Sequence, residues 1–132
     1  MPGGYRAAML EGAIVQAFLL TTDPQRARSF FEGVLGLRFL SGDEFGLEFD
    51  TGGAILRLAL VESFTPQRGT ALGWRVSDVP AAVRELAARG VVFERYDGMD
   101  QDDLGIWHPP GGGNVAWFKD PDGNTLSVSA HA

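Results

Sequence analysis

The sequence predicts an α+β fold made of two tandem modules, each with the element order strand, helix and three strands. Two helices, expected over residues 24–35 and 80–89, begin with the same local signal. Asp23 and Asp78 are placed to accept hydrogen bonds from free N–H groups, and a proline follows each within the first turn. The helices also repeat their apolar positions, which indicates equivalent faces packed on a sheet. This duplication is the main basis for the prediction.

Apolar runs separated by glycine-containing turns predict the strands. Strands or strand-like pieces are expected at 14–21, 37–40, 45–50 and 54–61, and then at 72–76, 91–96, 105–108, 114–119 and 125–129. We therefore assign module one to about residues 12–62, a linker with Pro66 and Gly69 to about 63–69, and module two to about 70–130, all within a single domain. The Asp-Pro-Asp-Gly-Asn turn at 120–124 is expected to use its side chains locally.

Composition excludes several function classes. The chain has 132 residues, enough for one domain with a core, and a net charge of −6, which argues against nucleic acid or an anionic membrane as a partner. There is no cysteine, so thiol nucleophiles and thiolate metal sites are excluded. The apolar run at 13–20 is interpreted as a buried strand and not as a signal peptide. A cytoplasmic location is expected.

Four motifs identify a family in this order along the chain. They are Thr22-Asp23 before the first helix, Phe-Phe-Glu-Gly-Val-Leu-Gly-Leu at 30–37, Val-Ser-Asp-Val at 76–79, and Trp-Phe-Lys-Asp-Pro-Asp-Gly-Asn at 117–124. With this order and spacing, residues 12–130 resemble the vicinal oxygen chelate superfamily, also called the glyoxalase / bleomycin resistance / extradiol dioxygenase fold. The resemblance implies curved mixed sheets around a cavity, with the helices outside. It also implies a divalent metal held by four side chains, usually His and Glu.

The resemblance places those four ligand positions at Gln16, Arg57, Ala71 and Ser127. Alanine has no donor atom, and arginine is a fixed cation that would repel a metal ion. The positions are therefore degenerate, and we expect neither a metal site nor another cofactor. The two histidines of the chain do not fall on these strand positions.

Side-chain alternation along the strands predicts what remains in the cavity. The expected cavity-lining residues are Gln16, Phe18, Glu48, Arg57, Arg75 and Ser127. Glu48 is expected diagonally across from Arg57, within reach of an ion pair. Either the pair is purely structural, or Arg57 binds an anionic or carbonyl-bearing ligand with Gln16 and Ser127 as hydrogen-bond partners.

A second constellation consists of Trp107, His108 and Trp117 around a Pro-Pro-Gly-Gly-Gly tip at 109–113. Its aromatic residues either pack against the hairpin or cap the cavity mouth. His108 is the candidate acid or base, and hence the candidate catalytic residue.

These observations favour a metal-free small-molecule-binding protein of the bleomycin-resistance type, with a small-molecule ligand as its partner. The alternatives are a metal-dependent lyase, isomerase or dioxygenase, a metal-free enzyme using Arg57, Glu48 or His108, and a structural dimer with a vestigial cavity. The resemblance also favours a homodimer.

Overall fold

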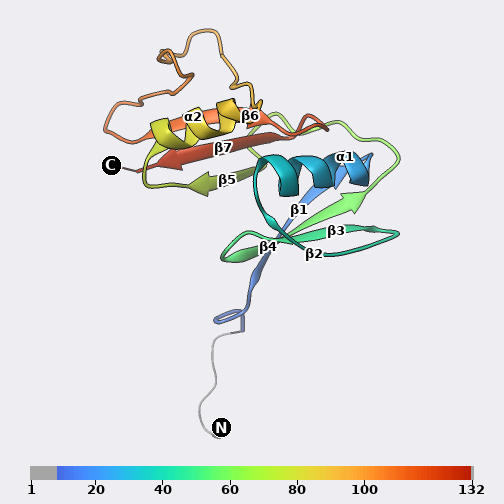
Figure 1. The fold of residues 1–132 in the computed structure, drawn as a ribbon. Coiled ribbons are helices and arrows are strands. Elements are labelled where there is room, and N and C mark those ends of the chain that lie inside the picture. The colour runs from blue at the N-terminus through green and yellow to red at the C-terminus, as the bar shows by residue number, and fades with distance from the viewer. Residues whose placement is uncertain (1–8, 132) are drawn as a thin grey trace, which may run out of the picture.

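The computed structural model describes residues 9–131, and its strands form two separate sheets that do not close into a barrel (Figure 1). Sheet one has the order β1-β4-β3-β2, and sheet two has the order β5-β7-β6. The strands are β1 (Val15–Thr21), β2 (Arg38–Asp43), β3 (Gly46–Asp50), β4 (Ala54–Leu60), β5 (Leu72–Arg75), β6 (Asn114–Lys119) and β7 (Thr125–Ala130). Both sheets are mixed, because β1 runs parallel to β4 and β5 runs parallel to β7. The predicted α+β class is confirmed.

The two helical segments begin where the sequence predicts. Asp23 caps α1 (Pro24–Arg28) by accepting from the Arg26 N–H, and Asp78 caps α2 (Val79–Ala88) by accepting from the Ala81 N–H. The first predicted helix differs in one respect, because α1 continues as a π-helical segment, η1 (Ser29–Val34). This segment lies where two consecutive phenylalanines pack in different directions. No helix in residues 9–131 is long and apolar enough to cross a membrane.

The strands predicted at 91–96 and 105–108 are wrong. Phe93 makes only a single bridge to Phe118, and Trp107 makes single bridges to Gln101 and Val115. The Gln101 side chain takes the place of a neighbouring strand, since it bonds the backbone of three residues. Its Nε2 donates to the Glu94 and Gly105 carbonyls at 2.9 Å, and its Oε1 accepts from the Tyr96 N–H at 2.7 Å. Side-chain bonds of this kind satisfy the backbone without a ladder.

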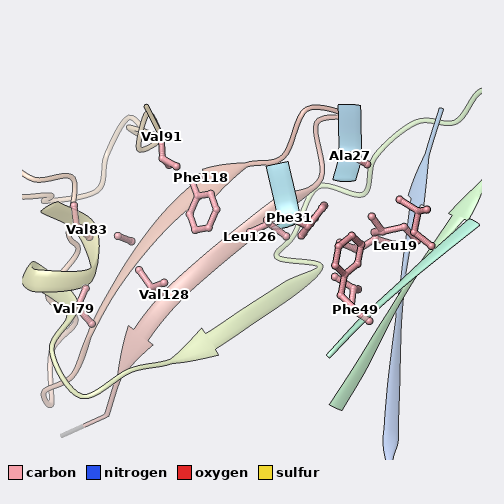
Figure 2. Packing of buried hydrophobic residues seen from close by; sticks show 14 of the residues in the cluster. Leu19, Ala27, Phe31, Phe49, Val79, Val83, Val91, Phe118, Leu126 and Val128 are labelled. Carbon is pink, nitrogen blue, oxygen red and sulfur yellow. The ribbon is translucent and has the colours of Figure 1, made fainter. Parts of the chain in front are cut away.

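One hydrophobic core joins the two modules. Figure 2 shows Phe31 between Phe118 and Leu126 of sheet two on one side and Phe49 of sheet one on the other. The ring centroids of Phe31 and Phe49 lie 5.9 Å apart, those of Phe31 and Phe30 lie 5.3 Å apart, and those of Phe30 and Phe118 lie 6.4 Å apart. Aromatic contacts at these separations are favourable. The η1 segment therefore holds the two sheets in position relative to each other through Phe30 and Phe31.

Candidate functional site

The face of sheet one that points away from α1 carries a polar cluster of Gln16, Glu48, Arg57 and Asp43. Alternation explains this face, because Leu56 and Leu58 point into the core and the residue between them, Arg57, points out of it. We call it the open face of sheet one. Three of the four clustered residues were predicted from the sequence; Asp43 was not.

The cluster is centred on the Arg57 guanidinium. Arg57 Nη1 lies 3.4 Å from Glu48 Oε2, and Arg57 Nη2 lies 3.5 Å from Asp43 Oδ1. Gln16 Nε2 lies 3.5 Å from the same Glu48 oxygen. These distances exceed those of optimal charge-assisted hydrogen bonds, so the cation is flanked by carboxylates without being tightly locked to either. The Arg57 side chain is 19% exposed.

The register corrects the predicted geometry of this pair. Glu48 lies directly opposite Arg57 in the β3–β4 ladder, not diagonally across from it. The turn lies one residue later than predicted. Asp50 pairs with Ile55, and the Thr51 N–H bonds the Ala54 carbonyl at 3.0 Å, which leaves Gly52 and Gly53 as the turn. Direct opposition brings the two side chains closer than diagonal placement would.

Asp43 was missed because no pattern in the sequence predicts that β2 extends beyond residue 40. In the structure β2 continues to Asp43, which pairs with Gly46. Backbone N–H groups of Phe45 and Gly46 and the Arg57 guanidinium together hold the pKa of Asp43 below its usual value, against a smaller effect of desolvation. Asp43 is thus a carboxylate at neutral pH.

An apolar strip on β1 borders the cluster. Phe18 is 63% exposed and lies beside Arg57 in the parallel β1–β4 register, and Leu20 follows it on the same face. A cavity of about 230 Å³ lies between this strip and the linker; Phe18, Leu20, Phe64, Pro66 and Ala71 are among its lining residues. Ala71, one of the four positions implied for metal ligands, therefore shares a cavity with Phe18.

The equivalent face of sheet two carries Ser127. Ser127 is 7% exposed and lies in register between Gly73 of β5 and Trp117 of β6. A side-chain carbon on Gly73 would collide with the Ser127 hydroxyl oxygen, so the hydroxyl fits only because residue 73 is a glycine. Arg75 lies further along β5, opposite Ser129, and its side chain makes no hydrogen bond or ion pair within residues 9–131.

The aromatic constellation packs on this face. The Trp107 and Trp117 rings are stacked with centroids 6.1 Å apart, and Tyr96 meets Trp117 edge-on at 5.5 Å. Trp117 Nε1 donates to the Thr70 hydroxyl at 3.0 Å, which ties the cluster to the linker end. The two predicted tryptophans therefore lie together, and Tyr96 joins them.

His108 is held by an exposed acidic partner. Its Nε2 lies 2.9 Å from Asp102 Oδ2, and Asp102 Oδ1 accepts from the Leu104 and Ile106 N–H groups. Desolvation opposes ionisation, but these bonds prevail and lower the pKa of Asp102. A carboxylate against an imidazole is the arrangement that orients a general base, although no nucleophile adjoins it in the described part of the chain.

The residues at the positions implied for metal ligands are divided between the modules. Gln16 and Arg57 lie on sheet one, whereas Ala71 and Ser127 belong to module two. Of the four, alanine has no donor atom and arginine is a fixed cation. The nearest carboxylates, Glu48 and Asp43, flank the Arg57 cation, a place where a metal ion would be repelled. Among the described residues, no group of three His, Cys, Asp or Glu side chains is placed to hold a metal ion.

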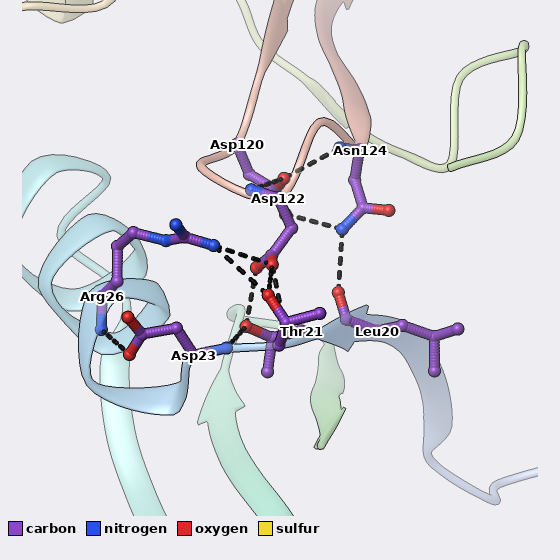
Figure 3. Close-up of polar contacts among 8 residues, drawn as sticks. Leu20, Thr21, Asp23, Arg26, Asp120, Asp122 and Asn124 are labelled. Atoms are coloured by element: carbon purple, nitrogen blue, oxygen red, sulfur yellow. Dashed lines mark hydrogen bonds and ion pairs between the residues drawn. The ribbon is translucent and has the colours of Figure 1, made fainter. Parts of the chain in front are cut away.

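The 120–124 turn does more than build a hairpin, and the prediction that its side chains act only locally is wrong. Figure 3 shows Asp122 reaching across to module one. Its carboxylate accepts from the Thr21 hydroxyl at 2.6 Å, from the Thr22 N–H at 3.0 Å and hydroxyl at 2.9 Å, and from Arg26 Nη2 at 3.0 Å. The Asp122 side chain is 2% exposed. Burial opposes its ionisation, but the bonds prevail and lower its pKa.

Two further turn residues complete this contact, which we call the module staple (Asp120, Asp122, Asn124, Thr21, Thr22 and Arg26). Asn124 Nδ2 donates to the Leu20 carbonyl at 3.1 Å and to Asp120 Oδ2 at 2.8 Å. Asp120 also accepts from the Asp122 and Asn124 N–H groups. Burial is the largest influence on Asp120 and raises its pKa, against the hydrogen bonds from Asn124.

Comparisons with known proteins agree with this fold. A model of the Glyoxalase/Bleomycin resistance protein/Dioxygenase superfamily matches residues 13–128. A Bacillus anthracis protein described as a glyoxalase family member has a similar structure, with a TM-score of 0.73, 16% identity and all of both chains covered. Lactoylglutathione lyase from Agrobacterium tumefaciens has a TM-score of 0.69 and 19% identity, over 89% of this chain and 92% of the other.

TioX from Micromonospora sp. ML1 is a third similar structure, with a TM-score of 0.67 and 23% identity, over 92% of this chain and 100% of the other. At these identities the likeness shows a shared fold. No curated protein sequence matches the chain.

Proposed function

We propose that this chain, which belongs to the Glyoxalase/Bleomycin resistance protein/Dioxygenase superfamily, binds a small molecule through Arg57 without the help of a metal ion. The observation that carries the proposal is a loosely held cation on an open face. Arg57 is 19% exposed, its carboxylate neighbours are 3.4 and 3.5 Å away, and an exposed phenylalanine lies beside it. A guanidinium with free donors next to apolar surface suits a ligand that carries a carboxylate or carbonyl group on an apolar body.

The ligand would compete with Glu48 and Asp43 for the guanidinium. Asp43 is half-exposed, so its pairing with Arg57 is screened by water and contributes little. Gln16 is positioned to contribute an amide on the same face, while the body of the ligand covers Phe18. Desolvating that ring supplies the apolar part of the affinity.

Ser127 and Trp117 lie on the face of sheet two that is equivalent to the open face of sheet one, and they too combine a polar with an aromatic side chain. We propose that they complete the ligand site in a homodimer, where sheet two of one chain faces sheet one of its partner. Exposed apolar side chains on and near β1, including Ile14, Val15 and Phe18, support an interface there. A cytoplasmic location remains our expectation.

The experiment compares Arg57→Met with Arg38→Met, a matched change on the same sheet at a strongly exposed arginine. Thermal-shift and calorimetric screens against carboxylates and glycopeptide antibiotics should give ligands whose affinity falls at least about tenfold in Arg57→Met and is unchanged in Arg38→Met. If no class of ligand stabilises the parent, or if both variants bind equally, the proposal is wrong.

Metal analysis tests the other half of the proposal. Protein purified without chelator should contain less than stoichiometric Fe, Mn, Ni or Zn. A stoichiometric metal would instead favour the alternative of a metal-dependent lyase, isomerase or dioxygenase. Light scattering at micromolar concentration should give the mass of two chains, and a monomeric mass would remove the proposed homodimer.

A further inference from the structure

A cavity of about 300 Å³ lies between the modules on the helix-covered side of sheet two. Leu35 and Leu37 line it from module one, and Trp74, Ala82, Leu86 and Phe118 line it from module two. We call it the junction cavity. It is separate from the surfaces discussed above, because Phe118 and Val128 point to the opposite face of sheet two from Trp117 and Ser127.

The walls of the junction cavity fit a single aromatic ring. Trp74 and Phe118 supply aromatic surfaces, and the leucines supply aliphatic ones. Small-molecule sites start at about 300 Å³, favour domain boundaries and are mostly apolar with a few polar groups. Since a cavity of about 150 Å³ already holds benzene, this one has room for a ring and a short polar substituent.

The polar group at the rim is a cation that both modules position. Arg89 Nη1 donates to the Val34 carbonyl of module one at 3.0 Å, and Arg89 Nη2 lies 3.2 Å from Glu85 Oε1. The Glu85 side chain is 68% exposed, and an exposed pair one helical turn apart is weak. Glu85 is therefore easily displaced by the carboxylate of a ligand, whereas the bond to Val34 keeps the guanidinium at the rim.

Trp74 allows binding in the cavity to be followed. The residue is half-buried and lines the cavity, so its indole N–H resonance reports on a ligand placed beside it.

We infer that the junction cavity is a second ligand site, for a monocyclic aromatic carboxylate. The ring lies between Trp74, Leu86 and Phe118, and the carboxylate replaces Glu85 on Arg89. The ligand contacts both modules, so its binding also strengthens their junction. This site does not depend on the proposed role of Arg57.

The test titrates phenylacetate into the full chain and into the Arg57→Met variant, which separates this site from the one on sheet one. Binding is followed by the ¹H–¹⁵N resonance of the Trp74 indole, assigned with Trp74→Phe. We expect a saturable shift in both proteins, with a dissociation constant of about 0.1–1 mM, the range for a ligand of about ten non-hydrogen atoms. Phenylacetamide, which lacks the charge, should bind about tenfold more weakly.

Ala82→Phe fills the cavity and should abolish the shift, while Ala81→Phe, an exposed neighbour on the same helix, should leave it unchanged. If circular dichroism shows that Ala82→Phe does not fold, Arg89→Met provides the test. Its affinity for phenylacetate should be about tenfold lower than that of the parent, and its affinity for phenylacetamide should be unchanged. The inference is overturned if the Trp74 indole shows no saturable shift. Equal binding to Ala82→Phe, or equal affinity for the acid and the amide, overturns it too.

Discussion

Removing the Asp122 carboxylate should weaken the whole protein, because this group joins the two modules. We expect Asp122→Ala to lower the free energy of unfolding by about 3 kcal/mol. Four hydrogen bonds end on the carboxylate, and bonds to a charged group contribute about 1.5–3 kcal/mol each when considered singly. These bonds share one acceptor, so their contributions are not additive. In the variant, water can replace the carboxylate as the partner of the exposed Arg26 and Thr22 groups. The largest share therefore belongs to the buried Thr21 hydroxyl.

Urea denaturation followed by far-UV circular dichroism measures the change, and a thermal melt should show a loss of about 10 °C. Arg26→Ala is the control for charge, since that arginine is half-exposed, and it should cost less than about 1 kcal/mol. Thr21→Val removes the hydroxyl with little change in shape. In a double-mutant cycle with Asp122→Ala, it should give a coupling of about 1 kcal/mol or more.

Two results would refute this account of the module staple. One is an Asp122→Ala protein within about 0.5 kcal/mol of the parent, the range of ordinary surface substitutions. The other is strict additivity with Thr21→Val, which would mean that the short contact between these side chains contributes no free energy. Either result would leave the phenylalanine contacts between the sheets as the main connection.

Three further predictions follow from the same geometry. Because the pKa of Asp122 is lowered in the folded state, its carboxylate stabilises the fold fully above the ordinary aspartate pKa of 3.8. This stabilisation is lost as pH falls through the lower folded-state pKa. Below about pH 4, the urea midpoint should therefore fall more in the parent than in Asp122→Asn. Gly73→Ala should lower the free energy of unfolding by about 1–3 kcal/mol, because the new methyl group collides with the Ser127 hydroxyl. In denaturation experiments, adding Ser127→Ala should restore most of this loss, and additive losses would contradict the collision. Asp102→Ala should speed amide hydrogen exchange across residues 102–108, because the Asp102 carboxylate accepts hydrogen bonds from two backbone N–H groups there. His108→Ala should change this exchange little, and equal effects of the two variants, measured by mass spectrometry, would contradict the prediction.

Local signals explain why so much of module one could be predicted from its sequence. Asp23 followed by proline specifies the start of a helix wherever the chain goes next, and the alternation around Arg57 fixes which face each side chain takes. The direct opposition of Glu48 and Arg57 depends in addition on which two residues form the connecting turn. The backbone hydrogen bond from Thr51 to Ala54 places that turn at Gly52 and Gly53, and the sequence pattern does not reveal this position.

The errors lie where a side chain replaces an expected backbone partner. Residues 91–96 have the composition of a strand, yet Gln101 bonds their carbonyl and N–H groups and no ladder forms. The turn containing Asp122 has the composition of a self-contained turn, yet its carboxylate is used by residues about a hundred positions earlier. A sequence pattern reports periodicity and turn chemistry, but it does not show which distant group a polar side chain meets.

The relative placement of the modules therefore depends on side chains, since the two sheets share no ladder among residues 9–131. Three contacts carry it: the module staple at Asp122, the phenylalanine contacts through Phe30 and Phe118, and the Arg89 bond to the Val34 carbonyl. The junction cavity is lined by residues of both modules, so a ligand there binds best when these contacts hold the walls in place. Loosening the staple should consequently weaken phenylacetate binding at Arg89 without any change in the residues that touch it.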